Sequence, residues 1–233
     1  MADSRIEAAA SRTTVSASVN IFSLPTEIRG CIYRLLLAVP HPLYLFQDTG
    51  SRLEVFTPGK PCQWLALLYT NRQISAEASA VLYGVNKFTL EEVGSAQYQG
   101  RLLKSFLDCI GSVNAGFLSH LCITFPAIQR IEERPDEISL AEAGLQSLER
   151  LRKKCSSLRT LEILVYGMNS SDLFRNDLEY SPSFREVLKE VNTQLRGIDG
   201  LNKIIVKISS GSPSLSVREF LLGLGWAVIS GKS

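Results

Sequence analysis

The chain has 233 residues, 45% of them hydrophobic, which is enough to bury a sizeable core in one large domain or in a small and a medium one. Its 25 basic and 23 acidic residues give a net charge of only +2, so no strong electrostatic attraction to nucleic acid or to an anionic membrane is expected. The five cysteines are scattered and odd in number, which indicates a reduced protein of an intracellular compartment, cytoplasmic or nuclear.

The first twenty residues are small and polar and lack the apolar run of a signal peptide, so we expect a disordered tail over 1–20. No stretch is long and apolar enough to span a bilayer, because Arg34 interrupts the longest candidate. We therefore expect no membrane association. The sequence leaves the oligomeric state open.

The first predicted helix covers residues 24–37. Pro25 suits the first helical position, and Glu27 complements the positive end of the helix dipole. Arg29 and Arg34 lie off the apolar stripe. That stripe recurs at helical spacing and predicts a face turned toward a core or a partner; its members are Leu24, Ile28, Ile32, Leu35 and Leu36.

Prolines 40 and 42 end this pattern, and two short aromatic-rich runs, 43–46 and 53–56, predict a β-hairpin. A second helix is predicted from Trp64 over about twenty residues, with Gly84 as its stop. Residues 86–90 form a short strand candidate. An ion pair between Glu27 and Arg72 is one way in which the two helices could be joined.

From there the chain alternates between helices and strands. Helices are expected around 102–110, 140–151, 184–195 and 218–224, and strands at 118–125, 158–165 and 201–208. Loops are expected at the acidic stretch 132–137 and at 167–181, and a tail containing Trp226 is expected to close the chain.

The three expected strands share one pattern, apolar-x-x-apolar-x-apolar, and begin 40 and 43 residues apart. Its members are Leu118, Leu121 and Ile123; Leu158, Leu161 and Ile163; and Leu201, Ile204 and Val206. The pattern is that of a leucine-rich repeat, although these units are longer than usual and lack the repeat's asparagine. We therefore predict an α/β fold with a short, repeat-like αβ stack, a parallel sheet and right-handed crossovers.

The opening Leu24-Pro25-Thr26-Glu27-Ile28-Arg29 resembles the first helix of an F-box. More closely, the chain resembles a group of fungal F-box-like proteins of unknown function, in which such a helix is followed by two further elements. Those elements match 68–78, with its Asn-Arg-Gln-Ile run, and 82–88, Leu-Tyr-Gly-Val-Asn-Lys-Phe. The resemblance covers residues 21–90 and includes the hairpin region 40–61, which a compact F-box lacks between its helices.

This resemblance implies an F-box-like helical region over 21–90, packed on the repeat-like region 91–233. It also implies a protein partner, the Skp adaptor of a cullin ubiquitin ligase, with the downstream region capturing a substrate. The residues that would contact the adaptor are Leu24, Pro25, Ile28, Ile32 and Leu36.

Residues suited to catalysis are sparse. The two histidines, His41 and His120, have no carboxylate nearby in sequence at ligand spacing, and there is no paired-cysteine motif, nucleotide-binding glycine loop or nucleophile elbow. His120 and Cys122 share one face of a strand, where a packed pair is a more common arrangement than a metal pair. We therefore expect a non-enzymatic protein with no cofactor and no metal.

Two alternatives to adaptor binding stay open. The first is a nucleic-acid or phosphate binder that uses a basic helix end, although the lack of interleaved aromatic residues makes nucleic acid the weaker reading. The second is a structural domain in which the apolar stripe of the first helix is internal core. The basic helix end consists of Arg150, Arg152, Lys153, Lys154 and Arg159.

Overall fold

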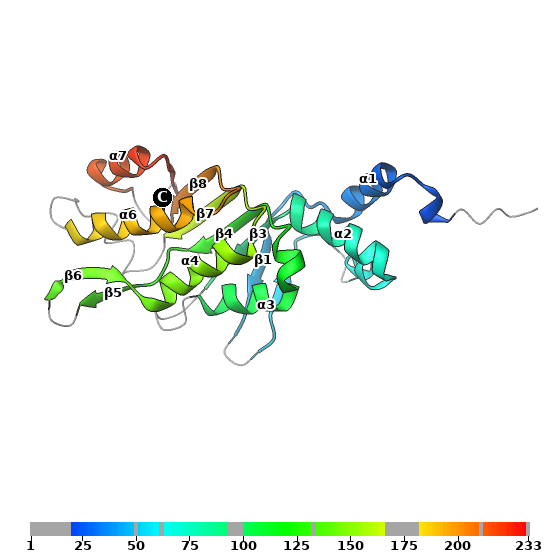
Figure 1. The fold of residues 1–233 in the computed structure, drawn as a ribbon, viewed down its shortest axis with the longest axis horizontal. Helices are drawn as coiled ribbons and strands as arrows, with labels where there is room; N and C mark the ends of the chain where they lie inside the picture. The colour runs from blue at the N-terminus through cyan, green and yellow to red at the C-terminus, as the bar shows by residue number, and fades with distance from the viewer. Residues whose placement is uncertain are drawn as a thin grey trace, which may run out of the picture.

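The computed structural model describes residues 20–48, 51–60, 63–92, 100–131, 134–165, 182–209 and 212–231. Over these ranges the protein is mixed α/β, with six α-helices and a mostly parallel seven-stranded sheet (Figure 1). The predicted α/β class with a parallel sheet is confirmed. Of the expected tail 1–20 only Asn20 is described, and the expected loop 167–181 lies outside the described residues.

The main sheet has the strand order β2-β1-β3-β4-β7-β8-β9. Only β2 runs antiparallel to its neighbour; the other neighbouring pairs are parallel. From β1 onward the spatial order follows the chain, with a helix between successive parallel strands. The strands are β1 Leu43–Phe46, β2 Glu54–Phe56, β3 Lys87–Leu90, β4 His120–Thr124, β7 Thr160–Val165, β8 Lys203–Ile208 and β9 Ala227–Ser230.

The repeated apolar pattern is in register across the three central strands. Leu121 pairs with Leu161, which pairs with Ile204, and the next pattern position aligns in the same way. These side chains are at most 5% exposed. Because alternate residues of a strand point to opposite faces, the pattern marks one buried face of the sheet.

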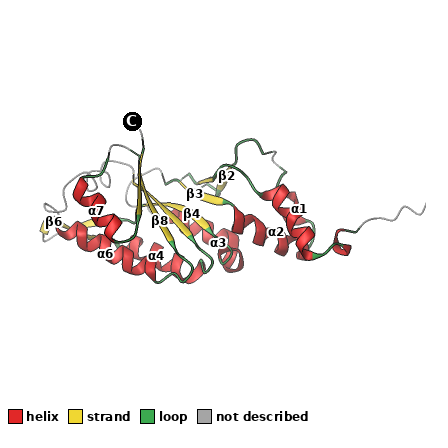
Figure 2. Cartoon of the chain, turned by 90° about the horizontal axis from the view of Figure 1, so that it is seen from above, coloured by secondary structure: helices red, strands yellow, loops and turns green. Residues whose placement is uncertain are grey.

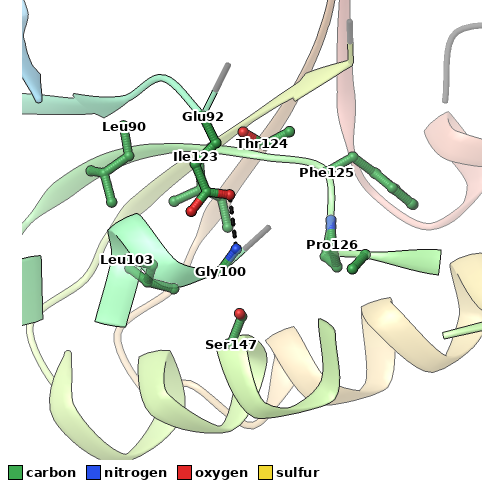
Figure 3. Close-up of a pocket in the computed structure, with 10 residues that line it drawn as sticks. Leu90, Glu92, Gly100, Leu103, Ile123, Thr124, Phe125, Pro126 and Ser147 are labelled. Atoms are coloured by element: carbon green, nitrogen blue, oxygen red, sulfur yellow. Dashed lines mark hydrogen bonds between the residues drawn. The ribbon is translucent and has the colours of Figure 1, made fainter. Parts of the chain in front are cut away.

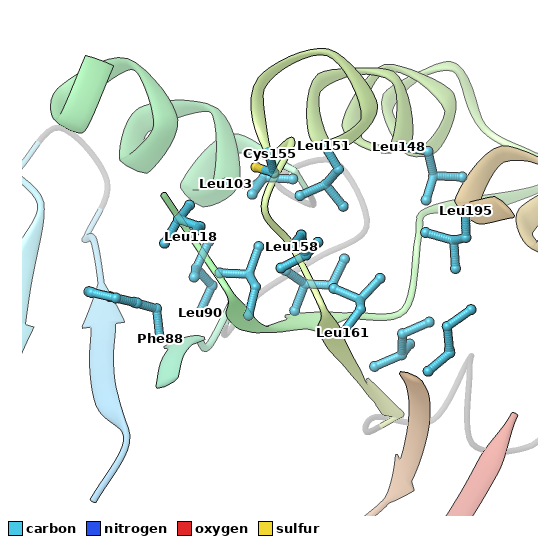
Figure 4. Close-up of a cluster of buried hydrophobic side chains, with 14 of the residues drawn as sticks. Phe88, Leu90, Leu103, Leu118, Leu148, Leu151, Cys155, Leu158, Leu161 and Leu195 are labelled. Carbon is cyan, nitrogen blue, oxygen red and sulfur yellow. The ribbon is translucent and has the colours of Figure 1, made fainter. Parts of the chain in front are cut away.

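The helices supply the other side of the core. Figure 2 shows α3, α4 and α6 in a row along one face of the sheet, and Figure 4 shows the leucines packed between them and the strands. The helices are α1 Thr26–Leu37, α2 Arg72–Val85, α3 Arg101–Ala115, α4 Glu142–Lys154, α6 Pro182–Arg196 and α7 Leu215–Gly223, with 3-10 turns at Ile21–Ser23 (η1) and Ala66–Tyr69 (η2).

The predicted hairpin is confirmed and belongs to the main sheet. Tyr44 of β1 lies opposite Phe56 of β2, and β1 also pairs with β3 along its other edge. The sheet therefore takes three strands from before residue 91 and four from after it. The core is continuous across that position.

The prediction of one long second helix from Trp64 to Gly84 is wrong. The chain forms η2 and then starts a new helix, α2, because the Asn71 Oδ1 accepts a hydrogen bond from the Ile74 amide at 2.9 Å. An asparagine side chain in this position satisfies an amide that has no partner within the helix. The helix also continues one residue past Gly84.

Two further predictions are corrected. The acidic stretch expected as a loop contributes to an antiparallel hairpin, β5 Ile128–Ile131 and β6 Arg134–Leu140. The expected tail holds strand β9. Trp226 precedes this strand with 1% exposure, and its Nε1 donates to Asn192 Oδ1 at 2.9 Å, so the chain end is tied to α6.

Candidate interaction surfaces

Helix α1 buries a charged and aromatic face against α2. Arg29, Tyr33 and Leu37, spaced four residues apart, are 6%, 1% and 0% exposed. Residues four apart lie on one side of a helix. The side of α1 that packs on the protein is therefore not its apolar stripe.

A hydrogen-bond network around Glu77 of α2 fixes this packing. Arg29 donates from Nε to Glu77 Oε2 at 2.8 Å and from Nη2 to Oε1 at 2.6 Å, and the Tyr33 hydroxyl donates to Oε2 at 3.0 Å. The hydrogen bonds from Arg29 are the main reason that the pKa of Glu77 falls to about 2. Among the described residues this ion pair joins the two helices, and the suggested pair between Glu27 and Arg72 does not form.

Asn86 attaches the end of α1 to the end of α2. This residue is 1% exposed; its Nδ2 donates to the carbonyls of Leu37 and Leu82, and its Oδ1 accepts from the Val39 amide, each at 2.9 Å. All three hydrogen bonds are to main-chain atoms. The first helix of the sequence motif therefore contacts both later elements of the motif in the fold. It contacts 68–78 through Glu77 and 82–88 through Asn86.

Three of the five residues in the apolar stripe of α1 are exposed. Ile28 is 48% exposed, Leu35 82% and Leu36 50%, and Pro25 is also exposed, while Leu24 and Ile32 are half-buried. At 100° per residue, Ile28 and Leu35 lie on the side of the helix opposite Tyr33. Within the described residues, Ile28, Leu35 and Leu36 of this stripe are therefore not part of the internal core. Phe22, 38% exposed, extends the apolar surface into the preceding turn.

The basic cluster at the end of α4 is largely engaged within the protein. Lys153 pairs with Glu149 of its own helix at 2.6 Å, and Lys154 pairs with Asp108 of α3 at 2.8 Å. Arg150 donates a hydrogen bond to Gln146 of the same helix. Arg152 lies beside Gly197, and Arg159, which directly precedes β7, is exposed. The five cations thus have different neighbours and do not converge on a shared site.

A glutamate, Glu92, is among the residues that line the small cavity at the carboxyl ends of β3 and β4 (Figure 3). Glu92 accepts hydrogen bonds from the amides of Gly100 and Leu102 at 2.8 Å, and so satisfies the start of α3. Burial raises the pKa of Glu92, although these amides oppose the shift. Gly100 is required here, because a Cβ would lie 2.4 Å from Ser147 Oγ at a φ of +84°.

His120 and Cys122 contact a carboxylate that sequence reasoning missed. His120 Nε2 lies 2.9 Å from Glu162 Oε1, across the pairing of β4 with β7. Burial raises the pKa of the Cys122 thiol to about 12, so the thiol is protonated at neutral pH. No group of three or more His, Cys, Asp or Glu side chains in the described part of the chain could hold a metal ion.

Comparison with known protein families, with curated proteins and with solved structures finds no match to this chain. Within the described ranges, no helix has both the length and the apolar character that crossing a lipid bilayer requires.

Proposed function

We propose that this protein is a non-enzymatic interaction module that binds a protein partner through the outward face of α1. The observation that carries the proposal is the exposure of the apolar stripe. Leu35, at 82%, and Ile28, at 48%, lie on a helix whose other side is held by Arg29 and Tyr33. Exposed apolar patches of this kind mark interaction sites in soluble proteins.

The partner that fits this face best is the Skp adaptor of a cullin ubiquitin ligase. One support is the resemblance of residues 21–90 to F-box-like proteins. The other is that the first helix of the motif contacts the two later elements through Glu77 and Asn86. Leu24, Pro25, Ile28, Ile32 and Leu36 would contact the adaptor, and Leu35 joins them. The αβ region 91–233, read as repeat-like, would then carry the surface that captures a substrate.

The position of α1 in the molecule suits recruitment. Figure 1 shows α1 and α2 at one end of an elongated molecule, with α6, α7 and the β5–β6 hairpin at the other. A partner bound on the outer side of α1 would leave the sheet and its helices accessible.

Leu35→Asp tests the proposal with little risk to the fold, because the side chain is exposed. A charge at the centre of an apolar contact should weaken adaptor binding at least tenfold, as expected for a contact at the centre of an interface. Titration calorimetry with the purified adaptor measures the effect. Leu215→Asp is the matched control, since Leu215 is 72% exposed at the start of α7.

Adaptor binding that is lost in Leu35→Asp and kept in Leu215→Asp would support the proposal. Failure of the unchanged protein to bind the adaptor would reject it. Equal affinities of the two variants would also reject it.

A further inference from the structure

The face of the sheet opposite α3, α4 and α6 has a charged centre. Alternate residues of the central strands point there, and no described helix covers them (Figure 2). Glu162 of β7 lies in the middle of this face with a side chain only 6% exposed. Its register neighbours are Cys122 of β4 and Ile205 of β8.

Three cationic or titratable groups converge on this carboxylate. Lys87 Nζ and Lys207 Nζ lie 2.5 Å and 2.6 Å from Glu162 Oε2, and His120 Nε2 lies 2.9 Å from Oε1. Burial alone would raise the pKa of Glu162, but the hydrogen bonds from His120, Lys207 and Lys87 outweigh it and hold the pKa well below its usual range. Glu162 is therefore ionised.

The charges at this centre do not balance. Among the described residues, two ammonium groups face one carboxylate, which leaves an excess of one positive charge even with His120 neutral. Each ammonium carries three N–H donors. The Lys87 and Lys207 side chains are 20% and 34% exposed, so they reach solvent above the buried carboxylate.

A third lysine adds to this surface. Lys203 is exposed and belongs to the same row across the strands as Lys87 and His120. In this row Lys87 pairs with His120, His120 with Thr160, and Thr160 with Lys203.

We propose that this face of the sheet binds an acidic polypeptide segment, with a carboxylate side chain placed between Lys87 and Lys207. One carboxylate neutralises the one excess positive charge, and the lysine N–H donors that do not point to Glu162 supply charge-assisted hydrogen bonds. Lys203 and His120 would meet a second acidic side chain of the same segment. This inference does not depend on the role of α1.

A polypeptide fits the surroundings better than a nucleic acid. On the same face, toward the β1–β2 edge, Phe46 and Phe56 are 40% and 56% exposed and offer apolar contact area. Glu54 pairs with Phe46 at that edge, and Glu162 is at the centre, so two carboxylates would repel a phosphodiester chain. Aspartate or glutamate spaced along a peptide can avoid both carboxylates.

The test uses a fluorescein-labelled peptide of glutamates and one phenylalanine, with the full-length protein, read by fluorescence polarisation. The double variant Lys87→Gln with Lys207→Gln should bind the peptide at least tenfold more weakly. The control is Lys104→Gln with Lys189→Gln, which removes equal charge from exposed positions on α3 and α6 and should change affinity less than twofold. Rising salt should weaken binding to the unchanged protein.

A second variant covers the case in which the double variant unfolds. Glu162→Gln removes the internal competitor for the two lysines, so peptide affinity should rise severalfold, whereas a purely structural cluster predicts no gain. An unchanged protein that does not bind the peptide would overturn the proposal. So would equal losses in the double variant and its control, or displacement of the peptide by an equal concentration of single-stranded RNA or inorganic phosphate.

Discussion

Arg29 is the residue on which the orientation of α1 depends. Its guanidinium also donates to the carbonyl of Leu24 at 2.7 Å, so the same side chain ties the chain before the helix to Glu77 of α2. Removing either partner of a partly buried ion pair of this kind lowers stability, because the other partner is left without its hydrogen bonds. Rotation of α1 that buried its apolar stripe would break the hydrogen bonds of Arg29 and Tyr33 with Glu77.

The hydrogen-bond network around Glu77 makes the free energy of unfolding depend on pH. The pKa of Glu77 is about 2 in the folded protein, against an ordinary value of 4.5. Below pH 4.5 the unfolded chain therefore takes up a proton that the folded protein does not. The contribution of Glu77 to stability is fully present above pH 4.5 and is lost as the pH falls toward 2.

Glu77→Gln should lower the free energy of unfolding at pH 7 and flatten its fall between pH 5 and pH 2. Urea unfolding across this pH range measures both effects. Glu186→Gln is the control, because this carboxylate of α6 is 69% exposed and should leave the curve nearly unchanged. Parallel curves for the unchanged protein and Glu77→Gln would contradict the role given to the network.

Sequence periodicity could show that α1 is amphipathic but not which side packs inward. From sequence alone, Arg29 is expected to be a surface residue. Its buried position depends on Glu77, which is 48 positions away in the chain. The same limit explains why Glu162 was missed. Its importance comes from Lys87, His120 and Lys207, which only strand pairing brings together.

At the scale of elements, strand β3 connects the two parts of the protein. It pairs with β1 on one side and with β4 on the other, and it contributes the buried Phe88 and Leu90 to the core. The ring of Phe88 stacks on Tyr83 of α2 and contacts Phe106 of α3. Helices and strands from before and after residue 90 therefore pack against each other in one core.

A fragment of residues 91–233 should not fold to a native state by itself. Without β3, strand β4 has an unpaired edge, and Phe106 loses the aromatic side chain against which it packs. Amide proton–nitrogen NMR spectra of the fragment and of the full chain test this expectation. A well-dispersed fragment spectrum that overlays the full-length spectrum would contradict it.

The elements that sequence predicted well are those with a strong apolar pattern on a buried face. Strands β4, β7 and β8 each place leucine, isoleucine or valine at alternate positions against the helices. Strand β9 was missed because Ile229 and Ser230 are exposed at the sheet edge and give no such pattern. The break before α2 was missed because the cap of Asn71 is a local hydrogen bond within an otherwise helical sequence.

At the scale of the whole molecule, the two proposed surfaces belong to different parts of the structure. Helix α1 is at one end of the elongated fold (Figure 1). The charged centre, by contrast, consists of side chains on the strands of the sheet. Two partners could therefore be held at the same time, as an adaptor that links a substrate to a ligase requires.

Thiol labelling tests the outward orientation of α1 most directly. Cys31 is exposed on α1, close to Ile28 and Leu35 on the helix surface, and Cys109 is exposed on α3 and serves as an internal control. In the free protein a maleimide should label both cysteines rapidly, as measured by mass spectrometry of their peptides. Saturating Skp adaptor should slow labelling of Cys31 at least tenfold and leave Cys109 unchanged. Slow labelling of Cys31 in the free protein, or the same rate with and without the adaptor, would contradict the account.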